Sequence, residues 1–134
     1  MTTTPPLTIE LETQAAQEVV DITARVEALI SKVRGGSCHV FLKHTTAGLM
    51  IVTSEKDVPI DIMDILQSLV PQRAYRHDSP AHVAAHFLSA LVGPSVHLPI
   101  HDGRLALGEF QRVVLMEFEG PRRRAIEIRL LAES

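Results

Sequence analysis

Histidines are the side chains of this chain best suited to chemistry, and six of the seven fall between His39 and His97. Imidazoles bind transition metals and exchange protons near neutral pH. His44 begins the sequence HTTAG between two apolar runs, where an ordinary hairpin turn more often carries Asn-Gly or Asp-Gly. Each histidine taken singly is more often a surface or core residue than a ligand. A shared site therefore requires the fold to bring several of them together.

Two histidines, His82 and His86, lie four residues apart in a predicted helix and so share one face. This spacing permits joint metal binding, but the residues between them are VAA, without the glutamate of an H-E-x-x-H metalloprotease helix. One histidine facing a site and the other on the surface is the better interpretation. His77 is followed by Asp78, which either orients the imidazole or caps the next helix, and we expect the cap.

The composition is that of one globular domain over residues 1–134, with residues 1–6 expected to be flexible. Hydrophobic residues make up 46% and charged residues 22%, and no window reaches the ~18 apolar residues of a membrane span. We expect neither a membrane span nor a signal peptide. The net charge of −3 argues against a general nucleic-acid binder. The lone Cys38 excludes an intrachain disulfide and indicates a packed core thiol in a reducing cytoplasm.

No nucleotide-binding loop and no C-x-x-C pair occurs in the sequence, so a P-loop, a dinucleotide fold and a zinc ribbon are not predicted. The one basic run is Arg122, Arg123 and Arg124. Its simplest interpretation is a solvated strand edge. Arginines also suit phosphate, because the planar guanidinium donates two parallel hydrogen bonds to it.

The elements that must position these residues can be predicted from periodicity. Alternation predicts a first strand over 7–13, and apolar steps of three and four predict a helix over 19–33. Two strands, 38–43 and 48–53, form a predicted hairpin around HTTAG. Further helices are expected at 54–70, with Ser54 or Asp57 as N-cap, and at 80–92. The remaining strands are predicted at 95–100, 104–107, 111–119 and 125–131. This order predicts an α+β fold, a largely antiparallel sheet or sandwich with helices packed on one side.

The order of the motifs resembles the YjbQ family. HTTAG, the acidic helix start SEKDVPIDIMD, YRHD, a helix with His86 seven residues before Gly93, then GPS, GRLALGEFQ and EFEGPRRR follow in that family's order over about residues 36–130. The resemblance implies a YjbQ-like fold and a homotrimer. It also implies a secondary thiamine-phosphate synthase, a transferase that joins hydroxymethylpyrimidine diphosphate to thiazole phosphate and releases pyrophosphate.

Residue by residue, the resemblance implies a catalytic cluster of His44, His77 and His86 with Glu55 beside it. It also implies substrate or phosphate contacts from Thr45, Thr46, Ser95, Gly103, Arg104 and Gln111. The acidic half departs from the family's pattern, because Glu55 comes two residues late and Val58 stands where an acid usually precedes the proline.

The sharpest expectation concerns His44, His77 and His86, which are 33 and 9 residues apart, so that only the fold can bring them together. Three imidazoles with an open position would suit zinc, and magnesium with the diphosphate is the other expected metal. We expect His82 to point elsewhere, and the remaining histidines to lie outside the site. Two alternatives stay open, a metal- or phosphate-binding module without turnover and a metal-dependent phosphate-ester hydrolase.

Overall fold

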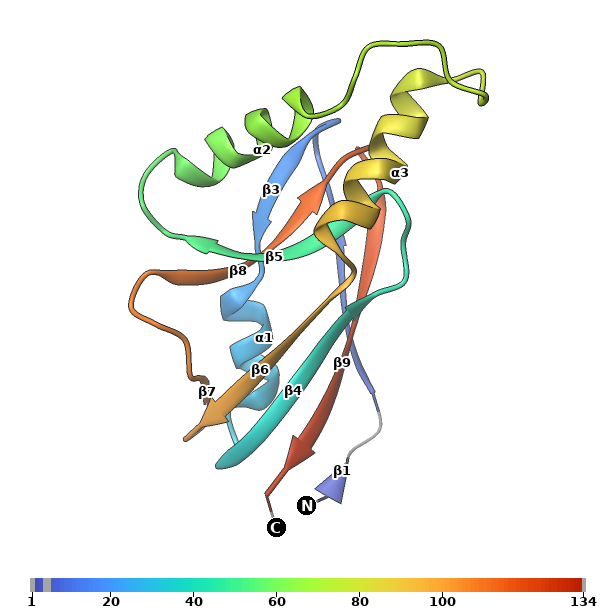
Figure 1. Ribbon diagram of the computed structural model, residues 1–134. Helices are drawn as coiled ribbons and strands as arrows, with labels where there is room; N and C mark the ends of the chain where they lie inside the picture. The colour runs from blue at the N-terminus through green and yellow to red at the C-terminus, as the bar shows by residue number, and fades with distance from the viewer. Residues whose placement is uncertain (1, 4–5, 134) are drawn as a thin grey trace.

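The computed structural model describes residues 2–3 and 6–133, and over these residues it has an α+β fold (Figure 1). The strands of this part are β1 (Thr2–Thr3), β2 (Leu7–Glu12), β3 (Glu18–Asp21), β4 (Gly35–Leu42), β5 (Ala47–Thr53), β6 (Ser95–His101), β7 (Arg104–Leu105), β8 (Gln111–Glu117) and β9 (Arg123–Ala132). Its helices are α1 (Thr23–Ile30), α2 (Val58–Ser68) and α3 (Pro80–Val92). The predicted fold class is confirmed.

The larger sheet is antiparallel, with the order β1-β9-β4-β6-β7. Strand β2 pairs with residues 123–128 of β9, on the edge of β9 that also pairs with β1. Its strands alternate as the sequence predicts, so that Cys38, Val40 and Leu42 of β4 point into the main core. In the register of β4 and β6, Gly35 faces His101 at one end and Phe41 faces Ser95 at the other. The 101–105 region and the end of β4 that precedes His44 therefore lie at opposite ends of this sheet.

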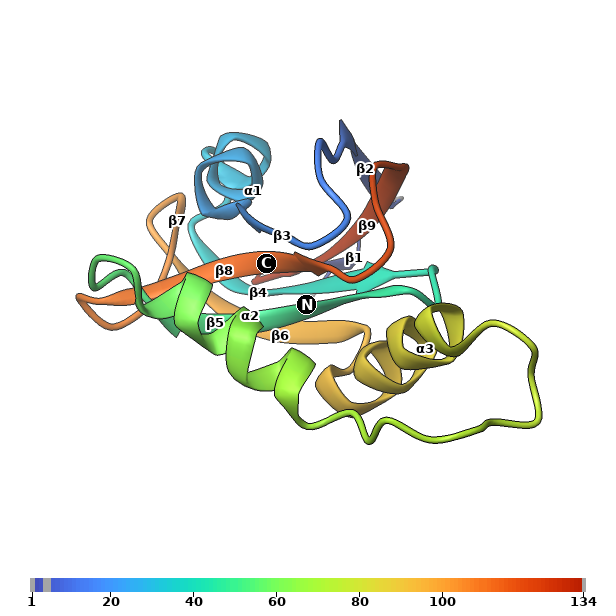
Figure 2. The same ribbon diagram turned by 90° about the horizontal axis from the view of Figure 1, so that it is seen from above.

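The smaller sheet has the order β3-β8-β5 and lies between two hydrophobic clusters. Val113 and Leu115 of β8 face the main core, which α1 also enters, whereas Val114 and Met116 face a second cluster that α2 and α3 cover. Figure 2 shows α1 on one side of this sheet and α2 and α3 on the other. Two helices thus share one side, and α1 packs on the opposite side.

Two local predictions are wrong. The helix predicted over 19–33 is shorter, because Val19 and Val20 lie in β3 and pair with β8, and α1 begins only at Thr23. The predicted hairpin does not form either, because β4 belongs to the larger sheet and β5 to the smaller one. The HTTAG segment therefore carries the chain from one sheet to the other.

The helix starts agree with the expectation in part. Asp57, one of the two expected residues, takes the N-cap position of α2 with φ of 68° but makes no side-chain cap bond. Ser79 takes the N-cap position of α3 in place of Asp78. The predicted bounds of α3 itself, 80–92, are confirmed. In the described residues, no helix has both the length and the apolar character needed to cross a membrane.

Candidate functional site

A pocket of about 370 Å³ lies where the β4–β5 connection meets α3. It is lined by His44, Thr45, His86, Ser89, Ala90 and Pro94. Gly48 holds the two segments together, because a Cβ there would lie 2.7 Å from Cγ1 of Val92. Gly48 lies within β5, where the close approach of α3 leaves no room for a side chain. Ser89 fixes the contact by donating to the Ala47 carbonyl at 2.7 Å.

His44 is fixed by the backbone of β9. Its Nε2 lies 3.1 Å from the Ala125 nitrogen and accepts that N–H. In the neutral ring the proton must then sit on Nδ1, which remains as the donor. Burial, and next the positive charge of Arg124, lower the pKa of His44 below its ordinary value. His44 therefore enters the pocket as a neutral imidazole with one N–H to donate.

His86 and His82 form a chain of polar contacts along α3. Nδ1 of His86 lies 2.9 Å from the Thr45 carbonyl, and its Nε2 lies 2.8 Å from Nε2 of His82. Nδ1 of His82 lies 2.6 Å from Oε2 of Glu119. The two rings meet edge to face, with centroids 4.3 Å apart. The expectation that His82 points elsewhere is wrong, because it shares the α3 face with His86 and Glu119 draws it inward.

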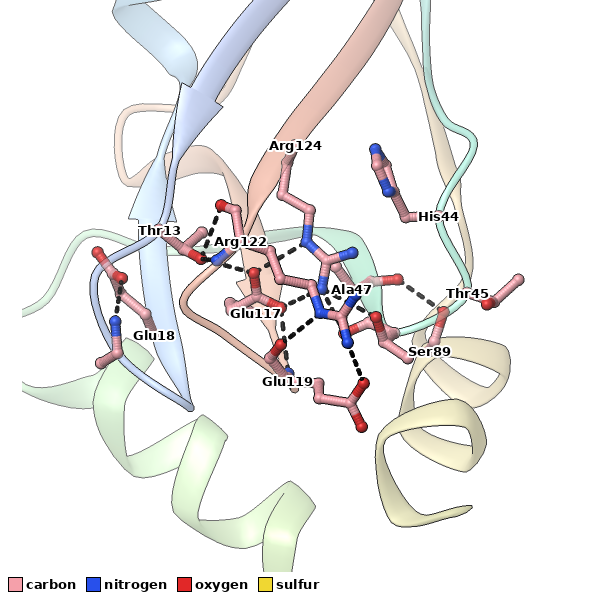
Figure 3. A network of polar contacts seen from close by, with 12 residues as sticks. Thr13, Glu18, His44, Thr45, Ala47, Ser89, Glu117, Glu119, Arg122 and Arg124 are labelled. Carbon is pink, nitrogen blue, oxygen red and sulfur yellow. Dashed lines mark hydrogen bonds and ion pairs between the residues drawn. The ribbon is translucent and has the colours of Figure 1, made fainter. Parts of the chain in front are cut away.

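Glu119 is itself held by Arg122, whose Nη2 donates to Oε1 at 2.7 Å and whose Nε donates to the Glu119 carbonyl at 2.9 Å. Burial acts to raise the pKa of Glu119, but the hydrogen bond from His82 and the charge of Arg122 lower it overall. Figure 3 shows this carboxylate beside the arginine. Sequence reasoning missed Glu119, whose one available signal is its place two residues after Glu117 at the end of a predicted strand.

Beneath the pocket a second Glu–Arg pair is fully enclosed. Glu117 is 0% and Arg124 2% exposed, and Arg124 Nε donates to Glu117 Oε1 at 2.8 Å. Arg124 Nη2 also donates to the carbonyl of Thr46 at 3.1 Å and to its hydroxyl at 2.9 Å. Thr13 donates its hydroxyl to Glu117 at 2.7 Å (Figure 3). Burial acts to raise the pKa of Glu117, and the bonds from Arg124 and Thr13 lower it overall.

This pair changes two interpretations made from the sequence. Arg124 is buried, so the simple picture of a solvated arginine run holds for Arg122 and Arg123 only. The hydroxyl of Thr46, expected to contact phosphate, is buried and already accepts from Arg124. Thr45 is exposed and lines the pocket, and its backbone carbonyl positions His86.

His77 stands outside the pocket but near its histidines. Its ring centroid is 5.4 Å from that of His82, and its Nδ1 accepts the Ser79 N–H at 3.0 Å. The side chain of Asp78 is fully exposed and lies 3.4 Å from this ring. His77 therefore flanks the His82–His86 pair at the start of α3.

The other predicted site residues divide between the ends of the molecule. Ser95 lies beside Phe41, near the histidine end, and is exposed. Arg104 and Gln111 line a separate pocket of about 440 Å³ that also includes His101. Seven residue steps of β4 separate the two ends of the sheet. This pocket is therefore about 23 Å from the pocket of His44 and His86. Gly103, with φ of 77°, closes the turn before β7 against the Ser31 carbonyl.

Glu55 also lies away from the histidines within one chain. It lies just beyond β5, whose six residue steps from Ala47 to Thr53 span about 20 Å. Its carboxylate accepts from the Thr53 hydroxyl at 3.1 Å, and it lines a pocket of about 290 Å³ with Asp21 and Arg112.

The expected three-histidine metal cluster is not assembled. Across residues 2–3 and 6–133, no three His, Cys, Asp or Glu side chains are grouped so that they could hold one ion. His44 and His86 do line one pocket, but Nε2 of His44 and Nδ1 of His77 already accept backbone N–H groups. The two histidine ring nitrogens that come into contact are Nε2 of His82 and Nε2 of His86.

Comparison with known proteins gives consistent results. The model of the family described as UPF0047 protein YjbQ-like matches residues 7–133. A UPF0047 protein of Archaeoglobus fulgidus is 37% identical over 125 residues, covering 92% of this chain and 98% of that protein. The UPF0047 protein YugU of Bacillus subtilis is 33% identical over 131 residues, covering 92% and 97%.

Solved structures show the same likeness. A YbjQ-like protein of unknown function from Sulfolobus solfataricus superposes with a TM-score of 0.89 at 28% identity, covering 98% of this chain and all of that one. An uncharacterized protein of the YjbQ/UPF0047 family from Clostridium acetobutylicum gives 0.85 at 32% identity, covering 93% and 99%. These matches extend over nearly the whole of each chain, so the likeness includes both sheets and all the segments around the pocket.

Proposed function

Because the chain belongs to the UPF0047 YjbQ-like family, we propose that it is an enzyme of the thiamine-phosphate synthase type acting at the pocket of His44 and His86. It joins hydroxymethylpyrimidine diphosphate to thiazole phosphate. The observation that carries the proposal is that two histidines 42 positions apart line one pocket, each with one ring nitrogen held by the backbone. Imidazoles fixed in this way are positioned before any ligand arrives.

The reaction demands little proton transfer at carbon. The bond between the pyrimidine methylene and the diphosphate oxygen breaks, and its electron pair leaves with pyrophosphate. The ring stabilises the resulting cation, and the thiazole nitrogen supplies the pair for the new carbon–nitrogen bond. The protein's task is to position both partners and to stabilise charge on the leaving group. The Nδ1–H of His44 and the hydroxyl of Thr45 are suitable donors to phosphate oxygens at the rim.

We further propose that the working site is shared between copies in a homotrimer. Arg104, Gln111 and Glu55 belong to the predicted site but lie about 20 Å or more from the histidines of their own chain. A neighbouring copy is the means of bringing them there. Large exposed apolar side chains on α2, at its C-cap and on α3 support an interface, and they are Ile60, Ile65, Leu69, Phe87 and Leu91. A clean monomer by light scattering at micromolar concentration would exclude the shared site.

The test of the reaction is direct. Purified protein is incubated with the two precursors, and thiamine phosphate and pyrophosphate are measured in equal amounts. We expect His44→Ala to lower the rate by 10²-fold or more, because it removes a fixed donor to the leaving group. His97→Ala is the matched control, since His97 is exposed on β6 and lines none of the pocket.

Complementation of a strain without its principal thiamine-phosphate synthase asks the same question in the cell. Rescue by the natural chain and not by His44→Ala supports the proposal. Release of phosphate from simple esters, with no thiamine phosphate formed, would assign a hydrolase, and ligand binding without either product would assign a binding module. A cytoplasmic location remains a prediction that rests on the lone thiol of Cys38.

A further inference from the structure

We propose that His82 and His86 are the two protein ligands of a divalent transition-metal site on α3, with Zn²⁺ as the metal that suits it best. The site deepens the proposed function by giving a metal position on the histidine face. It differs from the predicted set of three, because it includes His82 and needs neither His44 nor His77 as a ligand. The argument depends on the contacts of both nitrogens of each ring.

The hydrogen-bond partners determine where the ring protons lie. The Thr45 carbonyl can only accept, so His86 must carry a proton on Nδ1. Oε2 of Glu119 lies 2.6 Å from Nδ1 of His82, and a carboxylate oxygen accepts, so His82 likewise donates from Nδ1. With the proton of each neutral ring on Nδ1, both Nε2 atoms are unprotonated and carry a lone pair. These two Nε2 atoms lie 2.8 Å apart. Two lone pairs at this distance repel unless a cation lies between them.

The distance is close to what one metal ion requires. Two ligands at zinc–nitrogen distances of about 2.0–2.1 Å are about 2.8–3.0 Å apart at a right angle and about 3.3–3.4 Å apart in a tetrahedron. A small rotation of either half-buried ring spans that range. Imidazole ligands favour zinc, copper, nickel and cobalt over magnesium and calcium.

The surroundings of the pair are those of histidine ligands in metalloproteins. Such ligands commonly donate their second ring nitrogen to a carboxylate or a backbone carbonyl, which fixes the tautomer and raises the basicity of the other nitrogen. Here Glu119 serves His82 and the Thr45 carbonyl serves His86. Arg122 in turn fixes Glu119 through two hydrogen bonds (Figure 3). Glu119 is thus a positioning residue for the metal and not a ligand.

Two protein ligands leave the remaining metal positions open. The His82 side chain is 36% exposed, so water or a phosphate oxygen can reach the metal. His86 also lines the pocket in which we place the diphosphate substrate. The bound metal would offer a Lewis-acidic contact to the leaving pyrophosphate.

Calorimetric titration of the purified chain with Zn²⁺ in a buffer that does not chelate it tests the site. We expect one ion per chain, and at least tenfold weaker binding in His82→Asn and in His86→Asn. Asparagine can keep the hydrogen bond made by Nδ1, so each variant removes the ligating nitrogen with little other change. Circular dichroism checks that both variants fold. Co²⁺ gives a second measurement, since its visible absorption bands should appear in the natural chain and vanish in both variants.

A second histidine pair gives the matched control. His39 and His97 face each other across β4 and β6, with ring centroids 5.9 Å apart, but Nε2 of His97 lies 2.8 Å from the Ser37 hydroxyl. His97→Asn should leave zinc affinity within twofold of the natural chain. Glu119→Leu, which removes the acceptor for His82, should weaken zinc binding about tenfold, whereas Glu119→Gln should recover most of that loss.

No zinc binding by the natural chain, equal affinity in His82→Asn, or an equal loss in His97→Asn would overturn the site. The first of these results would mean that a shared proton joins the two rings. Zinc bound at His82 and His86 with no thiamine phosphate formed would keep this site and refute the proposed reaction. Full synthase activity in chain that binds no zinc would do the reverse.

Discussion

Two Glu–Arg pairs of the same composition lie side by side in this molecule and differ in their surroundings. Glu117 pairs with Arg124 and Glu119 with Arg122, across the turn between β8 and β9. Side chains of the first pair are 0% and 2% exposed, and those of the second are 23% and 50% exposed. The first carboxylate is completed by Thr13, and the second by His82.

The difference follows from place in the chain, because Glu117 and Arg124 lie in β8 and β9 whereas Glu119 and Arg122 lie in the turn between these strands. Residues 117 and 124 point inward and hold the HTTAG segment through Thr46. Residues 119 and 122 are more exposed and pair with each other, and Glu119 also contacts His82 of α3. Removing one partner of a buried ion pair strongly lowers stability, because it leaves the other charge buried without compensation. A pair at the surface contributes little energy but can orient a neighbour. We therefore expect the two pairs to respond very differently to the same changes.

The largest expected effect is that of Arg124→Met. It leaves the carboxylate of Glu117 buried with only the Thr13 hydroxyl and the Glu119 N–H as partners. The free energy of unfolding should fall by about 3–5 kcal/mol, measured by urea denaturation. Adding Glu117→Leu should recover part of this loss, because it removes the uncompensated charge. A loss below about 1 kcal/mol in Arg124→Met would contradict the distinction between the pairs.

Acid should act next most strongly, and again through the buried pair. The folded-state pKa of Glu117 lies below its ordinary value of 4.5. The stabilisation is therefore fully present above pH 4.5 and is lost as the pH falls through the folded pKa. Unfolding free energies measured from pH 7 down to pH 3 should fall steeply below about pH 4.5. The Glu117→Gln protein should show a flatter curve, and Glu119→Gln should retain most of the slope.

The smallest effect is expected for Arg122→Met, the counterpart of the first substitution in the outer pair. Its side chain is half exposed, so the unfolding free energy should change by no more than about 1 kcal/mol. Zinc affinity should nevertheless fall by a few fold, because Glu119 loses its anchor. Thermal melting and the zinc titration together check this result, and a large loss of stability with unchanged zinc binding would contradict it.

Most of the fold could be predicted from the sequence, because its signals are local. The bounds of α3 follow from its proline and its apolar face, and the strands of the second half follow from alternation. The helix over 19–33 was predicted too long because Val19 and Ile22 fit a helical step while Val19 pairs with β8. The predicted hairpin of β4 and β5 is wrong for a similar reason. The partner of each strand depends on the whole sheet and not on the connecting turn.

The site was predictable only in part. His44 and His86 meet at one pocket, but the part of His82 depends on the partner of each ring nitrogen, which no spacing reveals. Glu119 and Glu117 look equivalent in the sequence, and only their burial and their partners distinguish them. Arg124 shows the same limit, because three consecutive arginines carry no mark of the one that is enclosed.

The contacts that β9 makes with the HTTAG segment also affect the order of events in folding. Thr46 is held by a residue 78 positions later, and His44 by one 81 positions later. During synthesis the first half of the chain leaves the ribosome before β9 exists, so His44 and Thr46 lack these partners until β9 has been made. Contacts this distant in sequence form late in folding. A chain without β9 therefore lacks the contact that fixes His44, and a ligand of this pocket meets a fixed His44 only after β9 has joined the sheet.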